Sequence, residues 1–298
     1  MVTSGFFCKN HSPIERNGTG LTKRVFSVFY FLNCLDSHIF VLKIFKLSPT
    51  PQMRTVLLLI FALFITIPIT AHTSSKKLKI THLTGDFYVF TTHRIYEGSP
   101  FPSNGMYVIT SAGAVMIDCP WDTTQFQPIL DSIEHKHHTK VVMDIATHSH
   151  SDRSAGLEFF SQKGIRTYTT TQTDSLSKLK NEKRAKYHLS TDTTFTVGQY
   201  SFQILHPGQG HTPDNIVVWF EREKILYGGC LVKSTDSPVL GNLADANVPA
   251  WATTIKTLQK KCKNPNYIIP GHQSWKSKKS LEHTLKLVKE YNHRHSRK

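Results

Sequence analysis

The 298-residue chain is long enough to bury a large core, and its 18 Phe, 10 Tyr and 4 Trp exclude an intrinsically disordered protein. The composition also excludes a collagen, a coiled coil and a membrane protein with several spans. Lysine and arginine outnumber aspartate and glutamate by 36 to 21, which favours anionic partners without identifying them, and five cysteines are too few for a disulfide scaffold.

The N-terminal region contains a segment typical of a secretory signal peptide. Arg54 precedes an apolar run over residues 56–67, and small residues follow as far as Ala71. This pattern predicts a signal peptide over 53–71, cleaved near Ala71, and a periplasmic protein of the Gram-negative type. The run is short for a transmembrane helix, which needs about 20 apolar residues, so an uncleaved membrane anchor is the less favoured alternative.

Residues 1–52 precede this signal and show no pattern that indicates a function. Because signal peptides begin a chain, the simplest interpretation is a spurious or unstructured extension, with Met53 as the true start. A genuine N-terminal extension is the alternative. In both cases residues 72–298 are predicted to form a single domain.

The mature chain alternates between segments typical of strands and segments typical of helices. Short β-rich or apolar runs predict strands over residues 87–90, 106–109, 114–118, 141–146, 166–169, 194–197, 201–205, 216–220, 225–227 and 267–269. Helices are predicted over residues 126–138, 157–163, 173–179, 251–262 and 280–291. Strands followed by helices occur once in each half. This order predicts an α/β fold in which two mixed sheets lie face to face with helices outside, a four-layer sandwich.

The densest cluster of potential metal ligands follows the predicted strand 141–146. His148, His150 and Asp152 alternate along the chain, and in an extended segment side chains two residues apart project to the same side. The two imidazoles can therefore approach one cation together, with the carboxylate next in the row. Two imidazoles suit zinc and a nearby carboxylate suits a second ion, although a polar surface loop could contain the same cluster.

Three further residues of ligand type lie at the edges of predicted strands, each beside a glycine. They are His211, Cys230 and His272. Glycine allows the backbone to bend sharply and to come close to an ion. Each residue alone has an ordinary structural explanation, but four separate segments of this character favour a metal site.

The succession His-x-His-x-Asp, Gly-His, Gly-Gly-Cys and Gly-His resembles the metallo-β-lactamases, specifically their subclass B1 zinc enzymes, over roughly residues 78–292. Other hydrolases of that superfamily, such as glyoxalase II, carry histidine and a bridging aspartate where this chain has Arg153 and Cys230. One departure is Ala155-Gly156 in place of a common Gly-Gly, and we expect it to leave metal binding unchanged. The resemblance implies the metallo-β-lactamase fold and two zinc ions, the first held by His148, His150 and His211 and the second by Asp152, Cys230 and His272.

The resemblance further implies an enzyme that hydrolyses the β-lactam amide bond of penicillins, cephalosporins and carbapenems and so confers antibiotic resistance. Three neutral imidazoles leave the first zinc its full charge, so its bound water has a pKa of about 7. The expected mechanism is attack by this metal-bound hydroxide, oriented by Asp152, without a covalent acyl-enzyme. The chain contains no Ser-x-x-Lys followed by Ser-Asp-Asn, the motifs of a serine enzyme.

Four residues are implied to contact the substrate. Lys233 matches the lysine that pairs with the substrate carboxylate, and Asn242 matches the asparagine that hydrogen-bonds the lactam carbonyl oxygen. Residues 96–104 resemble the mobile flap of these enzymes, on which Tyr96 and Phe101 would contact apolar groups of the drug. The glycine and prolines of this segment oppose regular structure. Without the resemblance, Lys233 would be a solvated lysine and Asn242 a turn residue.

Other polar clusters are predicted to be ordinary surface, with 135–138 as the solvated end of a helix and Lys276, Lys278, Lys279 and 293–298 as solvated. Cys119 and Cys262 are expected to be free buried thiols. We expect a monomer whose partners are β-lactam substrates, without nucleic acid and without stable membrane association after signal cleavage. The alternatives are another hydrolase on the same scaffold, a nuclease suggested by the positive charge, and a secreted zinc-binding protein without catalysis.

Overall fold

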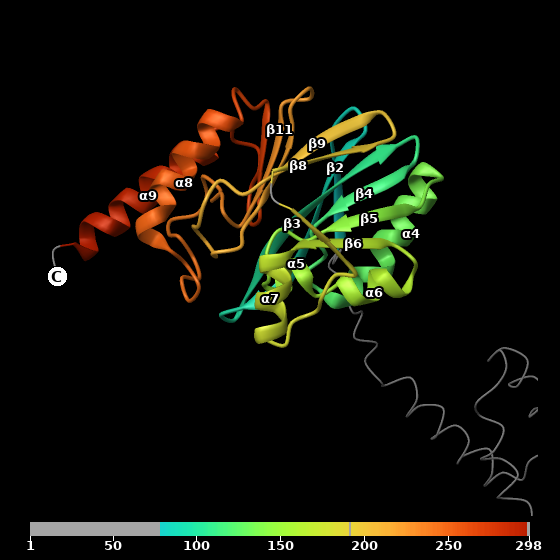
Figure 1. Cartoon of the computed structure of the whole chain (residues 1–298), viewed down its shortest axis with the longest axis horizontal. Coiled ribbons are helices and arrows are strands. Elements are labelled where there is room, and N and C mark those ends of the chain that lie inside the picture. Colours follow the sequence, from blue (N-terminus) through green and yellow to red (C-terminus); the bar gives the residue numbers. More distant parts are fainter. Residues whose placement is uncertain (1–77, 191, 297–298) are drawn as a thin grey trace, which may run out of the picture. The chain divides into compact units, whose positions relative to one another are not determined.

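The computed structural model describes residues 78–190 and 192–296 (Figure 1). The predicted signal peptide at 53–71 and the extension at 1–52 lie outside these residues. Within the described ranges, none of the helices combines the length and the apolar character that a membrane crossing requires.

Seven strands form the first sheet in the order in which they occur along the chain. They are β1 (Leu78–Thr84), β2 (Phe87–Tyr96), β3 (Ser99–Thr110), β4 (Gly113–Ile117), β5 (Val141–Ile145), β6 (Arg166–Thr170) and β7 (Tyr187–Leu189). The strands from β1 to β4 pair antiparallel, and those from β4 to β7 pair parallel. Antiparallel neighbours need only short turns, whereas parallel neighbours need crossovers. The crossovers contain α4 (Phe126–His137), α5 (Ser151–Ser154), α6 (Leu157–Gln162) and α7 (Thr171–Leu179).

Five strands form the second sheet, in the order β12-β11-β10-β9-β8. They are β8 (Thr193–Val197), β9 (Tyr200–Leu205), β10 (Val217–Phe220), β11 (Ile225–Gly229) and β12 (Tyr267–Pro270). Only β11 and β12 pair parallel, and α8 (Val248–Lys261) lies in the crossover between them. The chain ends in α9 (Ser280–His295), which packs beside α8.

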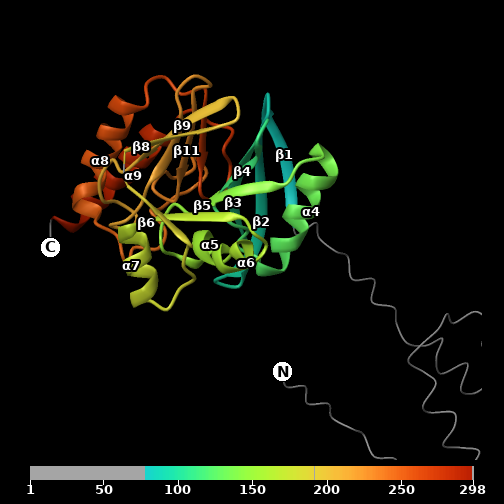
Figure 2. The same ribbon diagram turned by 45° about the vertical axis from the view of Figure 1, so that its right-hand side comes forward.

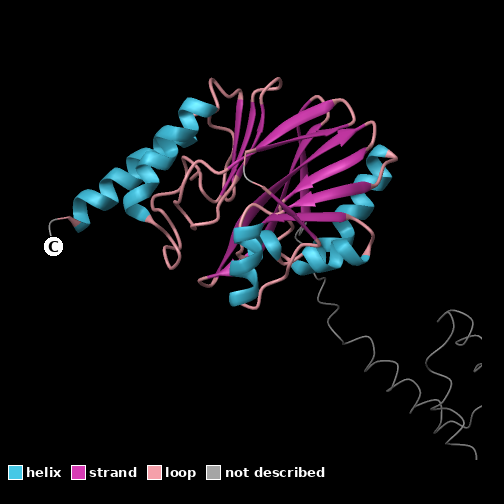
Figure 3. Cartoon of the chain, viewed as in Figure 1, coloured by secondary structure: helices cyan, strands magenta, loops and turns pink. Residues whose placement is uncertain are grey.

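Alternating side chains place an apolar core on both faces of each sheet. On β2, Phe87 and Val89 face the second sheet, whereas Phe90 packs outward against the helices, as the period of two in a strand requires. The inner core joins residues of both sheets, such as Val108 and Val218. Helices α4 and α6 cover the outer face of the first sheet, and α8 and α9 cover that of the second (Figures 2 and 3). The predicted four-layer sandwich of two mixed sheets is confirmed.

The predicted flap at 96–104 is not an irregular loop, and that part of the prediction is wrong. It is the end of the hairpin of β2 and β3, paired as far as Tyr96 and Ser99. Every second residue along a strand points its N–H group to the same edge of that strand. The N–H of Asn104 points away from β2 and donates to the Gly271 carbonyl. Pro102 and Pro100 precede Asn104 by two and four residues, so their backbone nitrogens also point away from β2. The pairing of β2 with β3 therefore loses no hydrogen bond at these prolines.

Candidate metal centre

The six predicted metal ligands lie in segments that follow or join strands, with Asp152 in the short helix α5 after β5. His148 follows β5, Cys230 directly follows β11, and His272 comes two residues after β12. Because β11 and β12 are parallel neighbours, their C-terminal ends lie at the same edge of the sheet. His211 lies in the loop between β9 and β10. The structure brings the six residues together as the two groups of three that the sequence predicted.

The first group consists of His148, His150 and His211, whose ligand atoms lie within 4.8 Å of one another. The three ring centroids are 4.8–5.1 Å apart and the ring planes cross at 77–85°. His148 Nε2 and His211 Nδ1 are buried and have no hydrogen-bond partner within the described residues. Burial lowers the pKa of both rings well below the usual range, so they are neutral and their lone pairs are available to a metal.

His150 is oriented by an outer hydrogen bond. Its Nε2 lies 2.7 Å from Asp245 Oδ2, and a carboxylate can only accept, so Nε2 carries the proton and Nδ1 keeps the lone pair. Lys180 Nζ donates to the same oxygen at 2.5 Å. The hydrogen bonds from Lys180 and His150 lower the pKa of Asp245. Such a carboxylate–histidine pair is the usual way in which proteins fix a metal-binding imidazole.

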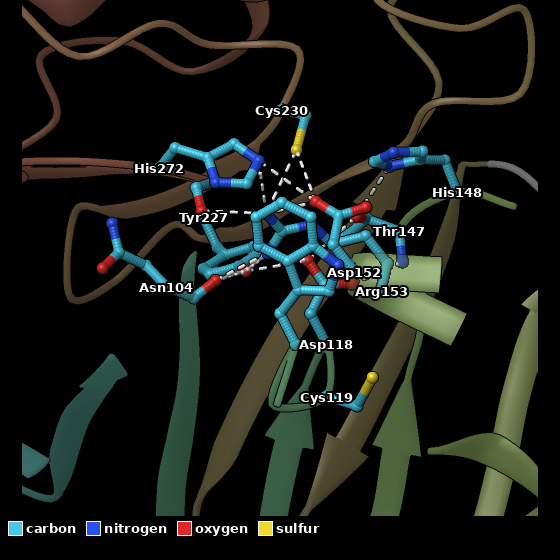
Figure 4. Close-up of polar contacts among 12 residues, drawn as sticks. Asn104, Asp118, Cys119, Thr147, His148, Asp152, Arg153, Tyr227, Cys230 and His272 are labelled. Carbon is cyan, nitrogen blue, oxygen red and sulfur yellow. Dashed lines mark hydrogen bonds and ion pairs between the residues drawn. The ribbon is translucent and has the colours of Figure 1, made fainter. Parts of the chain in front are cut away.

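The second group consists of Asp152, Cys230 and His272 (Figure 4). Asp152 Oδ2 lies 3.1 Å from His272 Nε2 and 3.5 Å from Cys230 Sγ. His272 Nδ1 donates to the Pro102 carbonyl at 2.8 Å, which leaves Nε2 directed at the other two ligands. The group therefore presents one oxygen, one sulfur and one nitrogen at a single point.

A buried guanidinium lies beneath the second group. Arg153 Nη2 is 2.9 Å from Asp152 Oδ2 and 3.1 Å from Cys230 Sγ, and the side chain is fully buried. Its Nη1 lies 3.4 Å from Asp118 Oδ2, which also accepts from Tyr227 Oη at 2.7 Å. Figure 4 shows Asp118 and Tyr227 on the side of Arg153 away from Cys230. The Arg153 guanidinium is thus held by the carboxylates of Asp118 and Asp152, and it also contacts the sulfur of Cys230.

These charges act differently on the two acidic ligands. Burial opposes ionisation of Asp152, but the Arg153 guanidinium outweighs it and holds the pKa of the carboxyl well below its usual range. Burial raises the pKa of the Cys230 thiol to about 12, although Arg153 acts in the opposite direction. Cys230 therefore needs a further positive charge to become a thiolate, and a divalent metal ion would supply it.

Gly271 allows the close packing of this group. A Cβ at this position would lie 2.7 Å from Cys230 Sγ and 2.8 Å from Arg153 Nη2. The Gly271 carbonyl also accepts from Arg153 Nη2 at 2.8 Å. Residue 271 therefore has no room for a side chain.

The donor atoms fit zinc. Imidazole nitrogen, thiolate sulfur and carboxylate oxygen are the ligands that zinc prefers, and the buried ring nitrogens of His148 and His211 lack any other partner among the described residues. Each group supplies three protein ligands. A structural zinc site is closed by four, so each group leaves a position for water or substrate.

Both groups open into a cleft of about 280 Å³. All four predicted substrate-contacting residues line it, namely Tyr96, Phe101, Lys233 and Asn242. A larger cavity, of about 660 Å³, lies among Phe87, Tyr200 and Tyr267 and contains none of the six ligands. We therefore assign the chemistry to the smaller cleft, because only there do ligand atoms converge.

Lys233 is not a solvated surface lysine. Its side chain is buried, and Nζ lies 5.2 Å from the centroid of the Trp251 ring. The Lys233 N–H donates to Thr284 Oγ1 of α9 at 2.7 Å, which fixes the backbone. Burial lowers the pKa of Lys233 to about 8. An ammonium held in this way at the wall of the cleft can bind an anion.

Asn242 and the aromatic residues occupy the rim. Asn242 Oδ1 accepts from the Ala244 N–H at 3.0 Å, and its Nδ2 makes no hydrogen bond within 78–190 and 192–296. Nδ2 is therefore free to donate to a substrate oxygen. Tyr96 and Phe101 lie on opposite strands of the hairpin, with ring centroids 5.9 Å apart. Phe101 also lies 5.1 Å from the His272 ring.

Several residues of the site were not predicted from the sequence. Trp121 lines the cleft, 5.7 Å from the His272 ring and 6.0 Å from Tyr96. Trp121 comes just after the predicted strand at 114–118, and other site residues also follow strands. This position could have indicated that Trp121 belongs to the site. Asp118, Tyr227 and Lys180 are ordinary in the sequence, and only the fold shows what they contact.

The remaining predictions concern residues away from the cleft. Cys119 and Cys262 are confirmed as free buried thiols. At the end of α4, His135, Lys136 and His138 are exposed as predicted. The fourth residue there differs, because His137 is half-buried with Nε2 3.1 Å from Tyr107 Oη.

Comparisons with known proteins agree with this geometry. Residues 98–272 match the model of the metallo-beta-lactamase superfamily. A metallo-beta-lactamase type 2 of Elizabethkingia meningoseptica is 43% identical over 217 residues, which cover 73% of this chain and 87% of the relative. The crystal structure of metallo-beta-lactamase IND-7 superposes with a TM-score of 0.70 at 38% identity, covering 72% of this chain and 99% of that one. FIM-1 from Pseudomonas aeruginosa, crystallised in a mono-zinc form, superposes with a TM-score of 0.67 at 27% identity, over 72% and 96% of the two chains.

Proposed function

The chain belongs to the metallo-β-lactamase superfamily, and we propose that its two ligand groups hold zinc for the hydrolysis of the β-lactam amide bond. This activity confers resistance to β-lactam antibiotics. The observation that carries the proposal is the convergence of two three-ligand groups on one cleft that also contains a buried lysine. The proposed substrates are penicillins, cephalosporins and carbapenems, which all carry a carboxylate near the lactam ring.

Zinc, when bound, supplies Lewis acids that activate water and polarise the carbonyl. His148, His150 and His211 bind as neutral rings and so leave the ion its full charge. Asp152 is ionised at neutral pH because the Arg153 guanidinium stabilises its carboxylate. We assign it the orientation of the attacking water, from which its free lone pairs can accept a hydrogen bond. None of these groups needs to form a covalent bond to the substrate.

The walls of the cleft hold the substrate for this attack. Lys233 Nζ pairs with the substrate carboxylate, and Asn242 Nδ2 donates to the lactam carbonyl oxygen. The rings of Tyr96, Phe101 and Trp121 cover apolar substituents and exclude water from the reacting bond. These two sets of contacts fix the ring between an anion-binding wall and an apolar wall.

We also propose that the protein acts outside the cytoplasm. The residue pattern at 53–71 supports export by a signal peptide with cleavage near Ala71. A monomer with its cleft open to diffusing drugs is sufficient for the reaction, because both ligand groups come from one chain.

The test is hydrolysis of a chromogenic cephalosporin and of a carbapenem by the purified protein, with and without a chelator. We expect turnover that the chelator abolishes and that added zinc restores. Zinc binding at two ions per chain without turnover would instead support a zinc-binding protein without this catalytic activity.

A further inference from the structure

A lysine outside the cleft reaches the first ligand group through one carboxylate. Lys180 lies immediately after α7, whereas Asp245 lies 65 residues later in the loop before α8. Lys180 Nζ and His150 Nε2 donate to the same oxygen, Asp245 Oδ2, at 2.5 and 2.7 Å. The three side chains therefore form a continuous chain from α7 to a metal ligand.

The partial burial of Lys180, Asp245 and His150 makes the hydrogen bonds between them stronger than ordinary surface contacts. The side chains of His150, Lys180 and Asp245 are 19%, 29% and 30% exposed. Partly buried charges are screened less by water and salt than fully exposed ones. Lys180 forms no ion pair with any other residue of the described chain, so Asp245 is its one anionic partner there.

Asp245 has little else to fix it. Its Oδ1 makes no hydrogen bond to any residue in 78–190 or 192–296, so the carboxylate is oriented only through Oδ2. Without the lysine, the carboxylate could rotate about its side-chain bonds while keeping only the bond to His150. Neutralisation of the carboxylate by Lys180 also limits its pull on the imidazole proton.

We propose that Lys180 is a positioning residue for the first ligand group: it fixes Asp245, which in turn orients His150 for zinc. The inference rests on the proposed role of the three histidines as a zinc site. It does not depend on which β-lactam is hydrolysed. Lys180 touches neither the cleft nor the proposed ligand atoms, so it acts only through Asp245.

The experiment compares zinc affinity in whole-protein variants by competition with a chromogenic chelator. Lys180→Met removes the charge, Lys180→Arg keeps it, and Lys183→Met is the matched control. Lys183 lies on the same loop but pairs with Glu158 at 2.9 Å. Losing an outer partner of a ligand costs about 10–100-fold in metal affinity, so we expect about 3–10-fold for this more distant residue. The zinc affinity of Lys180→Arg should stay near that of the parent protein, and the zinc affinity of Lys183→Met should be unchanged.

A double-mutant cycle tests whether the effect passes through the carboxylate. In an Asp245→Asn background, Lys180→Met should add no further loss, because the shared oxygen acceptor is already changed. An additive loss would overturn the proposal, as would equal zinc affinities for Lys180→Met and Lys183→Met. Cobalt substitution supplies a second readout, since the d–d absorption of ions at the histidine group should shift in Lys180→Met.

The thermal unfolding of the metal-free variants identifies a purely structural effect. Metal-free Lys180→Met should unfold at the same temperature as the metal-free parent protein. A lower unfolding temperature that accompanies the loss of zinc affinity would overturn the positioning role. If the parent protein itself binds no zinc, the proposed function fails. If the parent binds zinc normally and Lys180→Met does too, only this inference fails.

Discussion

The two ligand groups have the same number of ligands but opposite electrostatic surroundings. The histidine group consists of neutral rings, and its outer support is one partly exposed carboxylate. The Asp152–Cys230–His272 group lies on a fully buried arginine that two buried carboxylates hold in place. The first group therefore depends on the orientation of rings, and the second on a network of buried charges. Under the proposed function, an ion at the first group would activate water and an ion at the second would meet an anion.

The largest effect should come from removing the charge under the second group. Arg153→Met would leave Asp118 and Asp152 buried without their cation, which costs about 3–5 kcal/mol in free energy of unfolding. Urea unfolding of the metal-free protein measures this loss. Arg184→Met is the matched control, since Arg184 pairs with Asp174 at 2.6 Å but is 46% exposed, and its loss should be much smaller. Equal losses of unfolding free energy in Arg153→Met and Arg184→Met would show that the buried arginine contributes no more than an exposed one.

A second test removes one ligand while keeping the network. Cys230→Ser should reduce the zinc content toward one ion per chain, because a hydroxyl ligates zinc poorly. Turnover should fall by more than the roughly 10–100-fold that follows loss of an outer-shell partner. Metal analysis and chromogenic turnover check both results. Cys262→Ser changes a buried thiol remote from the cleft and should leave zinc content intact. Full zinc content in Cys230→Ser would exclude Cys230 from the site.

The contrast also predicts where the substrate anion binds. Lys233 lines the same cleft as Cys230, so Lys233→Ala should raise KM about tenfold for carboxylate-bearing drugs, the effect of one charge-assisted hydrogen bond. Steady-state kinetics with a substrate series measures this, and kcat should change less. Lys276→Ala, at an exposed position, is the control. An unchanged KM would place the carboxylate elsewhere.

The smallest effect concerns pH. Burial lowers the pKa of Lys233 to about 8, so its ammonium is charged below that pH and neutral above it. Affinity for a carboxylate should therefore be retained on the acid side of pH 8 and lost on the alkaline side. KM measured across this range should rise with pH in the parent protein. Lys233→Arg should give a flat profile, because a guanidinium keeps its charge. A rise that persists in Lys233→Arg would assign the titration to another group.

The sequence predicted the elements and ligands whose signals are local. The short β-rich runs at 87–90 in β2 and 106–109 in β3, and the apolar spacing in α4, identify strands and a helix without tertiary information. His148, His150 and Asp152 are visible because three ligands stand within five residues. The four-residue α5 and the short β7 were missed because such pieces carry too little periodicity.

The outer partners could not be predicted because distance along the chain hides them. Asp118 and Tyr227 lie 109 residues apart and meet only through the packing of the two sheets. Lys233 reads as a solvated lysine, and its burial depends on Trp251 and α9. The prolines at 100 and 102 suggested a break, yet the strand continues because their missing donors face an edge without a β2 partner.

Gly271 makes the centre of the site intolerant of substitution. A Cβ at residue 271 would lie only 2.7 Å from Cys230 Sγ and 2.8 Å from Arg153 Nη2, so even alanine would displace the sulfur or the guanidinium. Substitutions are accommodated more readily at the rim, for example at Ile95 near the end of the hairpin, whose side chain is 66% exposed. An inhibitor that relies on contacts near residue 271 would therefore meet a part of the site where few substitutions fit.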